Sequence, residues 1–323
     1  MKKKLLIVHN KIAENAGEDE LDVLDQAKLV EDACLDLGYL VERMEMNLDL
    51  GKAILRIREI GPDILFNLVE TLDNKGEFAF VATSVFSSLQ LPYSGSPLVS
   101  MLLASNKVLA KQELRRAGLP TPNWYSMAQT DQLDPDRQYI LKPTWEEGSL
   151  DLDDSSVFWG SDSRMKAIAG KKDRDHYFIE EYVDGREYNI SMLAGREGPE
   201  VLPLAEMQFL DYPKGKPRIL GYTSKWKENS FEYSHTRRTF EGRKEDRDLH
   251  TRLISLCKEC WHLFSLKGYA RVDFRVSLEG APFIIDINAN PCLSTSGGFS
   301  AACQQAGFTQ TEMIRRILED AYR

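Results

Sequence analysis

Four polar residues stand close together in an otherwise apolar stretch near the end of the chain, RVDFRVSLEGAPFIIDINANP. The stretch predicts two strands joined by a two-residue turn at Glu279-Gly280. With that turn, Asp273 faces Asp286 and Arg271 faces Asn288, and all four share one face because side chains alternate along a strand. We therefore expect a hairpin with one apolar face and one face that can do chemistry.

The same register sorts the other side chains of the hairpin. The apolar face is predicted to carry Val272, Phe274, Val276, Phe283, Ile285 and Ile287. The opposite face is predicted to carry Arg275 and Ile284 nearer the turn.

The two facing carboxylates need a cation between them. Carboxylates directly opposite each other in a strand pair repel by up to ~1 kcal/mol. Arg271 or Arg275 could supply the positive charge. A divalent metal is the alternative, because Mg²⁺ binds oxygen ligands and often only one or two protein carboxylates. The hairpin alone leaves both interpretations open.

Lysines and glutamates that precede the hairpin in the sequence stand where a nucleotide-binding site would need them. Lys142 ends the apolar strand YILKP, and Lys107 begins a helix after LLAS. The segment FIEEYVDGREY places Glu180 and Glu187 on either side of a predicted turn at Asp184-Gly185. Backbone amides there can read an adenine edge, and a carboxylate can accept ribose hydroxyls. The plainer alternatives are solvated lysines and an acidic hairpin.

The composition of the chain excludes several classes of protein. The 323 residues carry a net charge of -9 with no long basic run, so nucleic acid is not an expected partner. No apolar run approaches ~18 residues, so no membrane contact is expected. The run Leu5–Val8 is shorter than the ~7–15 residues of a signal-peptide core. We expect a cytoplasmic protein.

The five cysteines do not suggest a disulfide framework in a chain of this length. Cys257 and Cys260 form a CxxC, but the surrounding DLHTRLISLCKECWHLF has helical periodicity, which favours one face of an amphipathic helix over a redox or metal site. The five histidines show no ligand spacing, so zinc is not expected.

The first ~95 residues predict the alternating elements of an α/β unit. KLLIVH, YLVERME and DILFNLV are strand-like, and they are separated by two helical segments. The first helix places Val23, Ala27, Val30 and Cys34 on one face and ends at Gly38. This βαβαβ order predicts a parallel sheet. No glycine-rich fingerprint follows the first strand, so a Rossmann dinucleotide site is not supported.

The rest of the chain mixes helices and strands. The predicted helices are Phe78–Gln90, NKVLAKQELRRAG, Glu245–Leu266, Gly298–Gln305 and Gln310–Tyr322. Strands are predicted for QYILKP and for two segments of HYFIEEYVDGREYNISML. The segment Asp211–Arg243 is long, polar and aromatic with little periodicity, which is typical of a lid or a disordered segment.

Four segments occur in the order and spacing of the ATP-grasp ligases: KVLAKQELRRAGLPTP, YILKPTWEEGS, FIEEYVDGREYNI and ARVDFRV…FIIDINANPCLS. The chain resembles the D-alanine–D-alanine ligase group over about residues 60–323. The resemblance implies an ATP-grasp fold of the α/β (α+β) class. It implies an N-terminal parallel βαβ domain (1–96), a central ATP-grasp subdomain (97–183) and a C-terminal subdomain with the hairpin (184–323), the last two clamping ATP.

The resemblance also implies a role for each matched residue. The implied nucleotide contacts are Lys107, Lys142, Glu180, the backbone of Glu181, Tyr182 and Val183, Glu187, Lys225 and Ile285. The implied ligands of two Mg²⁺ ions, which Mn²⁺ could replace, are Asp273, Asp286 and Asn288. The implied catalytic residues are Arg271, Lys225 and Ser149. Arg271 would stabilise the oxyanion of a tetrahedral intermediate, and Lys225 would reach the terminal phosphate.

The departures from the group fall on the side of the amino-acid substrates. NKIAENAGEDELD replaces a loop that contains glycine, serine and a glutamate. Leu150 replaces a second serine after Ser149, Trp226 replaces a lid tyrosine, and Cys292 replaces a glycine. The tail loop STSGGFS differs where the carboxylate of the second substrate would dock.

We therefore expect an ADP-forming ligase that joins the carboxylate of an amino acid to another amino acid or other amine through an acyl phosphate. Its substrates are not expected to be two D-alanines. D-alanine–D-alanine ligase itself and a catalytically silent nucleotide-binding protein are the alternatives. A homodimer is one arrangement open to the chain.

Overall fold

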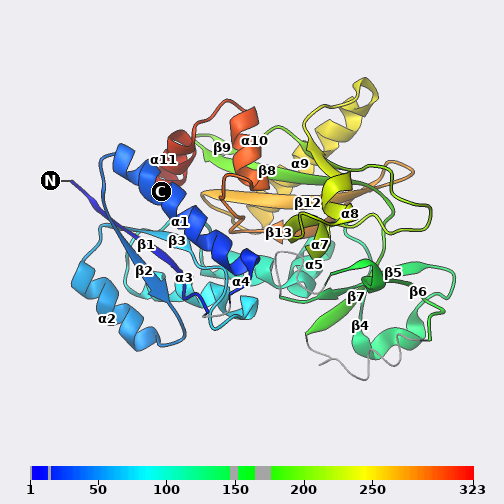
Figure 1. The fold of residues 1–323 in the computed structure, drawn as a ribbon, viewed down its shortest axis with the longest axis horizontal. Helices are drawn as coiled ribbons and strands as arrows, with labels where there is room; N and C mark the ends of the chain where they lie inside the picture. The colour runs from blue at the N-terminus through cyan, green and yellow to red at the C-terminus, as the bar shows by residue number, and fades with distance from the viewer. Residues whose placement is uncertain (1, 14–15, 146–151, 164–175) are drawn as a thin grey trace.

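The N-terminal sheet is parallel, as predicted, and its strand order is β2-β1-β3. The structure is a computed structural model, and it describes residues 2–13, 16–145, 152–163 and 176–323 (Figure 1). The strands are β1 (Lys4–Asn10), β2 (Leu40–Met46) and β3 (Ile64–Leu68). The side chains of β3 are all buried, which is expected of a parallel strand covered on both faces.

Helices α1 (Glu18–Asp36), α2 (Leu50–Ile60) and α3 (Ala79–Ser88) accompany this sheet. The predicted apolar face of α1 is confirmed, because Val23, Ala27, Val30 and Cys34 are all buried. The helix predicted over Phe78–Gln90 opens instead with a 3₁₀ turn at Gly76–Phe78. At the other end of the chain, α10 (Gly298–Gln305) and α11 (Gln310–Asp320) pack back on the N-terminal unit, and Figure 1 shows α11 beside α1.

A four-stranded antiparallel sheet lies in the middle of the chain, with the order β4-β7-β5-β6. Its strands are β4 (Trp124–Ser126), β5 (Gln138–Pro143), β6 (Val157–Trp159) and β7 (Tyr177–Glu181). Short 3₁₀ segments at Met127–Gln132 and Asp154–Ser156 complete this part. It has a small core of its own, formed by Met127, Leu133, Tyr139, Leu141, Phe158 and Ile179.

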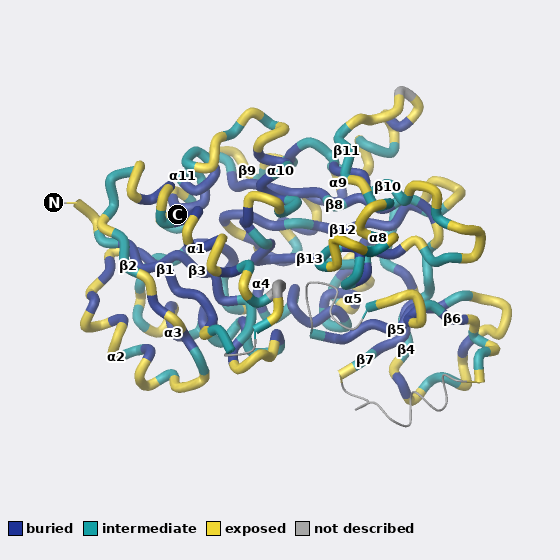
Figure 2. The backbone as a smooth tube through the Cα atoms, viewed as in Figure 1, coloured by how far each residue is buried: buried dark blue, intermediate teal, exposed yellow. Residues whose placement is uncertain are grey.

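The third sheet holds the predicted hairpin and has the order β11-β10-β8-β12-β13, with β9 paired to β8. Its strands are β8 (Gly185–Gly195), β9 (Gly198–Val201), β10 (Ala205–Phe209), β11 (Thr236–Thr239), β12 (Tyr269–Ser277) and β13 (Pro282–Asn288). One face packs on α4 (Leu98–Ser105), α5 (Lys107–Arg116) and α9 (Arg247–Leu263). Figure 2 shows β8, β12 and β13 as a buried centre of the molecule.

Cys257 and Cys260 lie on α9 and are fully buried in the core below this sheet. Burial raises the pKa of both thiols. The interpretation as one face of an amphipathic helix is confirmed.

The turn of the β12–β13 hairpin differs from the prediction. It has three residues, because the Ser277 amide donates to the Ala281 carbonyl oxygen at 2.9 Å, and Gly280 takes the left-handed φ of 87° that such loops favour. A β-bulge at Ile285 then shifts the register by one residue. The two departures cancel, so Asp273 still pairs with Asp286.

The longer turn and the bulge change the faces of three apolar residues. Phe274 pairs with Ile284, which is fully buried in the core, whereas Phe283 pairs with Arg275 and Ile285 is only partly buried. The predicted places of Ile284 on the polar face and of Phe283 and Ile285 on the apolar face were wrong, because the extra turn residue shifts residues 282–284 by one position and the bulge restores the register only at Asp286.

The predicted turn at Asp184-Gly185 is also wrong. β7 pairs with β4 and β5, whereas β8 pairs with β9, β10 and β12, so residues 182–184 connect two different sheets. Gly185 has a φ of 143°, and a Cβ there would lie 2.0 Å from the Val276 carbonyl oxygen. The glycine allows β8 to approach β12 closely and does not serve a turn, so the acidic hairpin considered for this segment is excluded.

The segment Asp211–Arg243 contains more regular structure than its sequence predicts. It holds α7 (Tyr222–Trp226), α8 (Phe231–His235) and strand β11. Each helix has five residues, which is too short for a helical periodicity to be seen. None of the described helices is both long and apolar enough to cross a membrane.

Candidate active site

A cavity of about 1140 Å³ opens between the three sheets, and most of the predicted site residues line it. They are Lys107, Lys142, Glu180, Tyr182, Val183, Glu187, Lys225, Arg271, Asp273, Ile285, Asp286 and Asn288. The Glu181 side chain instead contacts Asn123 and Arg137. Ser149 and Leu150 lie outside the described residues. Strands and helix α5 thus bring together side chains up to 181 positions apart in the sequence, Lys107 and Asn288 among them.

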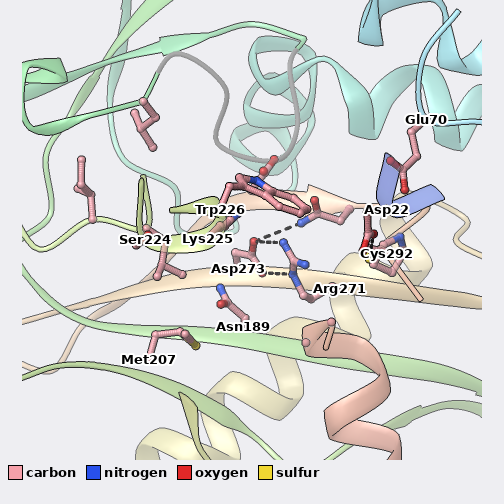
Figure 3. A pocket seen from close by; sticks show the side chains of 18 of the residues that line it. Asp22, Glu70, Asn189, Met207, Ser224, Lys225, Trp226, Arg271, Asp273 and Cys292 are labelled. Carbon is pink, nitrogen blue, oxygen red and sulfur yellow. Dashed lines mark hydrogen bonds and ion pairs between the residues drawn. The ribbon is translucent and has the colours of Figure 1, made fainter. Parts of the chain in front are cut away.

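The third sheet supplies one wall, and its register arranges the polar side chains in rows. Asn189 of β8 pairs with Asp273 of β12, which pairs with Asp286 of β13. Two residues along β12, Arg271 pairs with Asn288. The predicted grouping of the hairpin residues is therefore observed (Figure 3).

Arg271 neutralises Asp273 directly. Its Nε and Nη2 donate to the two carboxylate oxygens at 2.7 and 2.8 Å, and Asn288 Nδ2 donates to Oδ2 at 3.3 Å. A bidentate pair of this kind fixes the plane of the guanidinium. The sequence offered Arg271 or Arg275 as the cation between the two carboxylates, and the structure places Arg271 on Asp273.

Asp286 has a different cation. Lys107 Nζ lies 3.6 Å from its Oδ2. Asn106 caps the start of α5 by accepting from the Leu109 amide, which fixes Lys107 at the first turn. Burial raises the pKa of Asp286, but Lys107, Lys142 and Arg271 outweigh it and hold the pKa below its usual value. Asp286 is therefore an anion at neutral pH.

The chemistry of this donor set fits magnesium. Two carboxylates and one amide present oxygen atoms to the cavity, and Mg²⁺ prefers oxygen ligands together with phosphate and water. Asn288 uses its amide nitrogen toward Asp273, which leaves the amide oxygen for a metal. In the described parts of the chain, no three His, Cys, Asp or Glu side chains form a metal cluster on their own.

Lysines and a glutamate form a buried ion cluster at the other end of the cavity. Lys142 Nζ donates to Glu180 Oε1 at 2.6 Å, and Lys111 pairs with the second oxygen of Glu180. Burial raises the pKa of Glu180, but the two lysines outweigh it and lower the pKa. Burial lowers the pKa of Lys111. Lys111 was not expected from the sequence, although it follows Lys107 by one helical turn.

Arg275 binds the backbone of the segment that connects the central sheet to the third sheet. It donates to the carbonyl oxygens of Val183 at 2.9 Å and Gly185 at 3.2 Å, and it pairs with Glu187 at 3.1 Å. Because these bonds occupy its guanidinium, Arg275 is not the cation between the carboxylates of Asp273 and Asp286. Burial raises the pKa of Glu187. The linker backbone at 182–183 is thereby fixed along the cavity edge.

Lys225 and Trp226 reach the cavity from α7. Figure 3 shows Trp226 over the Arg271–Asp273 pair. Burial, and then the positive charge of Arg271, lower the pKa of Lys225. Its ammonium makes no hydrogen bond or ion pair to another residue that the structure describes, so it is available to an anion. Ile285 lines the same cavity because of the bulge.

The N-terminal unit closes the far end with acidic side chains that were not singled out in the sequence. Cys292 Sγ donates to Asp22 at 2.9 Å, and Gln26 Nε2 donates to both Asp22 and Glu70. Gln26 Oε1 accepts from the Leu293 amide at 2.9 Å. Asp22 and Gln26 are one helical turn apart on α1, at the end of the acidic stretch that departs from the ligase pattern. The Cys292 side chain therefore faces the cavity and this acidic end.

Known proteins similar to this chain are D-alanine–D-alanine ligases for the most part. Residues 163–319 match the family model described as "D-ala D-ala ligase C-terminus". The D-alanine–D-alanine ligase of Aquifex aeolicus is 26% identical over 299 residues, which cover 91% of this chain and 94% of that protein. The Synechococcus enzyme of strain JA-2-3B'a(2-13) is 25% identical, over 88% of this chain and 84% of its own length. The chain is thus similar to D-alanine–D-alanine ligases over most of its length.

This similarity does not establish which substrate the protein uses. An uncharacterized protein of Sinorhizobium fredii, y4sG, is 29% identical over 80% of this chain and 75% of its own length. The fold agrees with a Bacillus anthracis D-alanine–D-alanine ligase complexed with ATP, at a TM-score of 0.75 and 17% identity, over 99% of this chain and 98% of that one. The ATP-grasp fold expected from the sequence is therefore confirmed, and the protein is homologous to ADP-forming amide-bond ligases.

Proposed function

We propose that the protein is an ATP-dependent carboxylate–amine ligase that forms ADP and an amide bond through an acyl phosphate. The observation that carries the proposal is the shared cavity face of Arg271, Asp273, Asp286 and Asn288. A protein that only binds nucleotide has no need of an arginine and two carboxylates held together at the reacting end. Domain limits of 1–96, 97–183 and 184–323 belong to the same proposal.

The first step transfers the terminal phosphoryl group of ATP to an oxygen of the substrate carboxylate, and ADP leaves. Lys107, Lys142 and Lys225 are the cations we assign to the phosphates. Lys142 can keep Glu180 as a partner, because an ammonium has three donors. Asp273, Asp286 and Asn288 would hold Mg²⁺, which supplies charge neutralisation during phosphoryl transfer. The 182–183 backbone, Glu180 and Glu187 are assigned to the nucleoside.

In the second step the amine nitrogen attacks the acyl carbon. An amide C–N bond forms, the C–O bond to phosphate breaks, phosphate leaves, and the nitrogen loses its proton. We assign Arg271 to the oxyanion of the tetrahedral intermediate. Its plane is already fixed by Asp273, so little reorganisation is needed when the negative charge develops.

The experiment that tests the proposal separates these steps. Purified protein with Mg-ATP and a panel of amino-acid carboxylates is assayed with hydroxylamine, which converts an acyl phosphate into a hydroxamate and phosphate. Amines then replace hydroxylamine, and products are identified by mass. Carboxylate-dependent hydroxamate and ADP are expected. ATP binding without either product would show a silent nucleotide-binding protein.

D-alanine–D-alanine ligase is the second candidate, because the matched relatives with named activities carry that name. We expect D-alanine alone to be a poor substrate. The acidic end formed by Asp22 and Glu70, together with Trp226 and Cys292, replaces the group's amino-acid contacts, and sites built to pair polar groups discriminate strongly. Turnover of D-alanine as fast as that of the best compound in the panel would contradict this expectation, as would growth rescue of a ligase-deficient bacterium.

A further inference from the structure

Two leucines of helix α1 are exposed where the helix borders the cavity. Leu21 is 44% exposed and Leu24 is 38% exposed, and both line the cavity. They stand three positions apart, so they lie on the same face of the helix. Single exposed leucines are common on protein surfaces and indicate nothing by themselves. A pair on one helix face at a cavity wall is different, because a ligand in that cavity can cover it.

Helices α7 and α8 supply aromatic side chains to the same cavity. Trp226 of α7 and Tyr233 of α8 line it, and Tyr233 is 40% exposed. Figure 3 shows Trp226 over the Arg271–Asp273 pair, so this apolar surface adjoins the proposed reacting end. When an apolar group fills a cavity, the apolar side chains around it lose contact with water, which favours binding. The cavity can therefore accept an apolar group near the site of acyl transfer.

The carboxylates beside the leucines indicate how an amino acid would lie. Asp22 follows Leu21, and Gln26 Nε2 donates to Asp22 at 3.1 Å and to Glu70 at 2.9 Å, which holds the two carboxylates close together. Nearby negative charges stabilise a protonated amine. An attacking amine must instead be unprotonated, because its lone pair forms the new bond. The two carboxylates therefore suit the ammonium of the amino acid that is activated, since that group takes no part in the reaction.

We propose that the amino acid activated by ATP carries a large apolar side chain, which packs on Leu21 and Leu24. This inference rests on the proposed ligase function and names the class of its carboxylate substrate. The ammonium would lie at Asp22 and Glu70 and the reacting carboxylate beside Arg271, so the side chain extends along the face of α1 that carries the leucines. A side chain as small as that of alanine would leave both leucines in contact with water.

The experiment measures kcat/KM for hydroxamate formation with amino acids of increasing apolar size: alanine, valine, leucine and phenylalanine, each as both enantiomers. Glutamate and lysine serve as charged donors of similar length. Hydroxylamine is the nucleophile throughout, so the second substrate cannot contribute to any difference. Leu21→Ala and Leu24→Ala are compared with Leu35→Ala, because Leu35 is 53% exposed and stands at the opposite end of the same helix.

A second measurement does not depend on turnover. Thermal unfolding is followed with Mg²⁺, a non-hydrolysable ATP analogue and each amino acid of the series. An amino acid that binds the folded protein raises its Tm. The unliganded Tm of each variant is the control for folding.

We expect kcat/KM to rise with apolar size, with leucine or phenylalanine at least about 10-fold above alanine, because apolar cavities discriminate to that extent for a single methylene. This advantage should fall about 10-fold in Leu21→Ala or Leu24→Ala, the lower end of the effect of one methylene, since the leucines are partly open to water. The kcat/KM for alanine and the KM for ATP should change less than about two-fold, because only the contact with a larger side chain is removed. Leu24→Trp fills the space and should shift the preference to smaller donors, and Leu35→Ala should be like wild type.

Two results would overturn the inference. One is a wild-type protein that uses alanine, glutamate or lysine as well as the best apolar donor. The other is a leucine variant that loses activity with alanine and with larger donors alike, because the leucines would then pack on α7 and α8 and not on the substrate.

Absence of hydroxamate with every amino acid, in wild type as well, is a different failure and refutes the ligase function itself. The Tm then still decides whether apolar amino acids bind at the leucines. A rise with leucine or phenylalanine that Leu24→Ala abolishes would support that binding site, and no rise with either would overturn it.

Discussion

We assign different chemical tasks to Arg271 and to Asp286, so their loss should affect different steps of the proposed reaction. We expect Asp286→Asn to weaken Mg-ATP binding and phosphoryl transfer together, because Asp286 is a proposed metal ligand. Arg271→Ala should leave Mg-ATP affinity near normal and reduce product formation by about 10²–10³-fold, the usual loss for one oxyanion donor. Calorimetric titration with Mg-ATP and single-turnover kinetics measure the two effects.

The opposite pattern belongs to a purely structural hairpin. If Arg271 only neutralised Asp273, Arg271→Ala would lower the thermal stability and Asp286→Asn would be mild or stabilising, since one of two facing charges is removed. Unchanged nucleotide affinity in Asp286→Asn would count against the metal site. Arg271→Lys keeps the charge without the bidentate geometry, so it separates charge from orientation.

Cys292 offers a prediction about reactivity. Burial, then the charges of Glu70 and Asp22, raise the pKa of its thiol, so the thiolate is scarce at pH 8. The other four cysteines are buried. We expect native protein to react with a thiol reagent far more slowly than denatured protein, and Glu70→Gln or Asp22→Asn to accelerate labelling of Cys292. Native labelling at the rate of a free thiol would show that the acidic groups do not act on it.

At the scale of single residues, the sequence could place the polar face of the hairpin but not its details. Period-two alternation puts Arg271 and Asp273 on one face of their strand and Asp286 and Asn288 on one face of theirs. The two pairs share a face only because the three-residue turn and the bulge cancel, and no local pattern marks that bulge. Leu24 and Asp22 enter the cavity only because distant elements meet, and sequence periodicity contains no information on that meeting.

At the scale of elements, the cluster of Lys111, Glu180 and Lys142 joins helix α5 to the four-stranded sheet. Glu180 is 2% exposed and faces two ammonium groups, so Glu180→Gln leaves two cations without their counter-ion. We expect a loss of about 3–5 kcal/mol, typical of a broken buried ion pair. Urea unfolding measures it, and Glu181→Gln is the matched control, because its exposed ion pair contributes little.

The same cluster predicts a pH dependence with a definite sign. The folded pKa of Glu180 is lowered, so its contribution to stability is complete above the ordinary carboxylate pKa of ~4.3 and is lost as the pH falls through the folded value. The double variant Glu180→Leu/Lys111→Met removes both charges of the most buried pair. We expect it to be more stable than Glu180→Gln and to lose this acid sensitivity. An equal acid transition in wild type and double variant would contradict the assignment.

For the N-terminal unit the alternation of elements and the parallel sheet were predictable, and the strand order was not. Pairing of sequence neighbours would place β3 beside β2, whereas β3 pairs with β1. β7 and β8 follow each other in the sequence, and a short connection between neighbouring strands favours a hairpin. That prediction fails because β7 belongs to one sheet and β8 to another. The pairing is decided by tertiary packing, here by the close approach of Gly185 to β12.

At the scale of the whole molecule, the cavity lies between the sheets, and the segment Asp211–Arg243 makes contacts that connect its walls. Lys216 pairs with Asp154 of the central part and with Glu232 of α8. Arg275 donates to the Arg218 carbonyl oxygen at 2.9 Å, and Tyr182 accepts from the Arg218 amide at 3.0 Å. These hydrogen bonds connect the segment Asp211–Arg243 to the backbone at 182–183, which we assign to the nucleoside. We call this segment the lid. Bound nucleotide should therefore stabilise the closed lid, and the closed lid should stabilise bound nucleotide.

We predict that the lid is protected from protease by Mg²⁺ and a non-hydrolysable ATP analogue. Trypsin should cut at the exposed Lys214 and Lys227, and the cleavage rate should fall when the analogue is bound, because Lys225 then gains an anionic partner and holds α7 down.

Lys216→Met breaks both bridges, so the same sites should be cut faster without nucleotide, whereas Lys258→Met on the exposed side of α9 should not change them. Because closure and nucleotide binding are coupled reciprocally, Lys216→Met should also weaken binding of the analogue by the factor by which it increases opening. Equal cleavage with and without the analogue, in wild type and Lys216→Met alike, would show that this segment is a fixed wall of the cavity and not a lid.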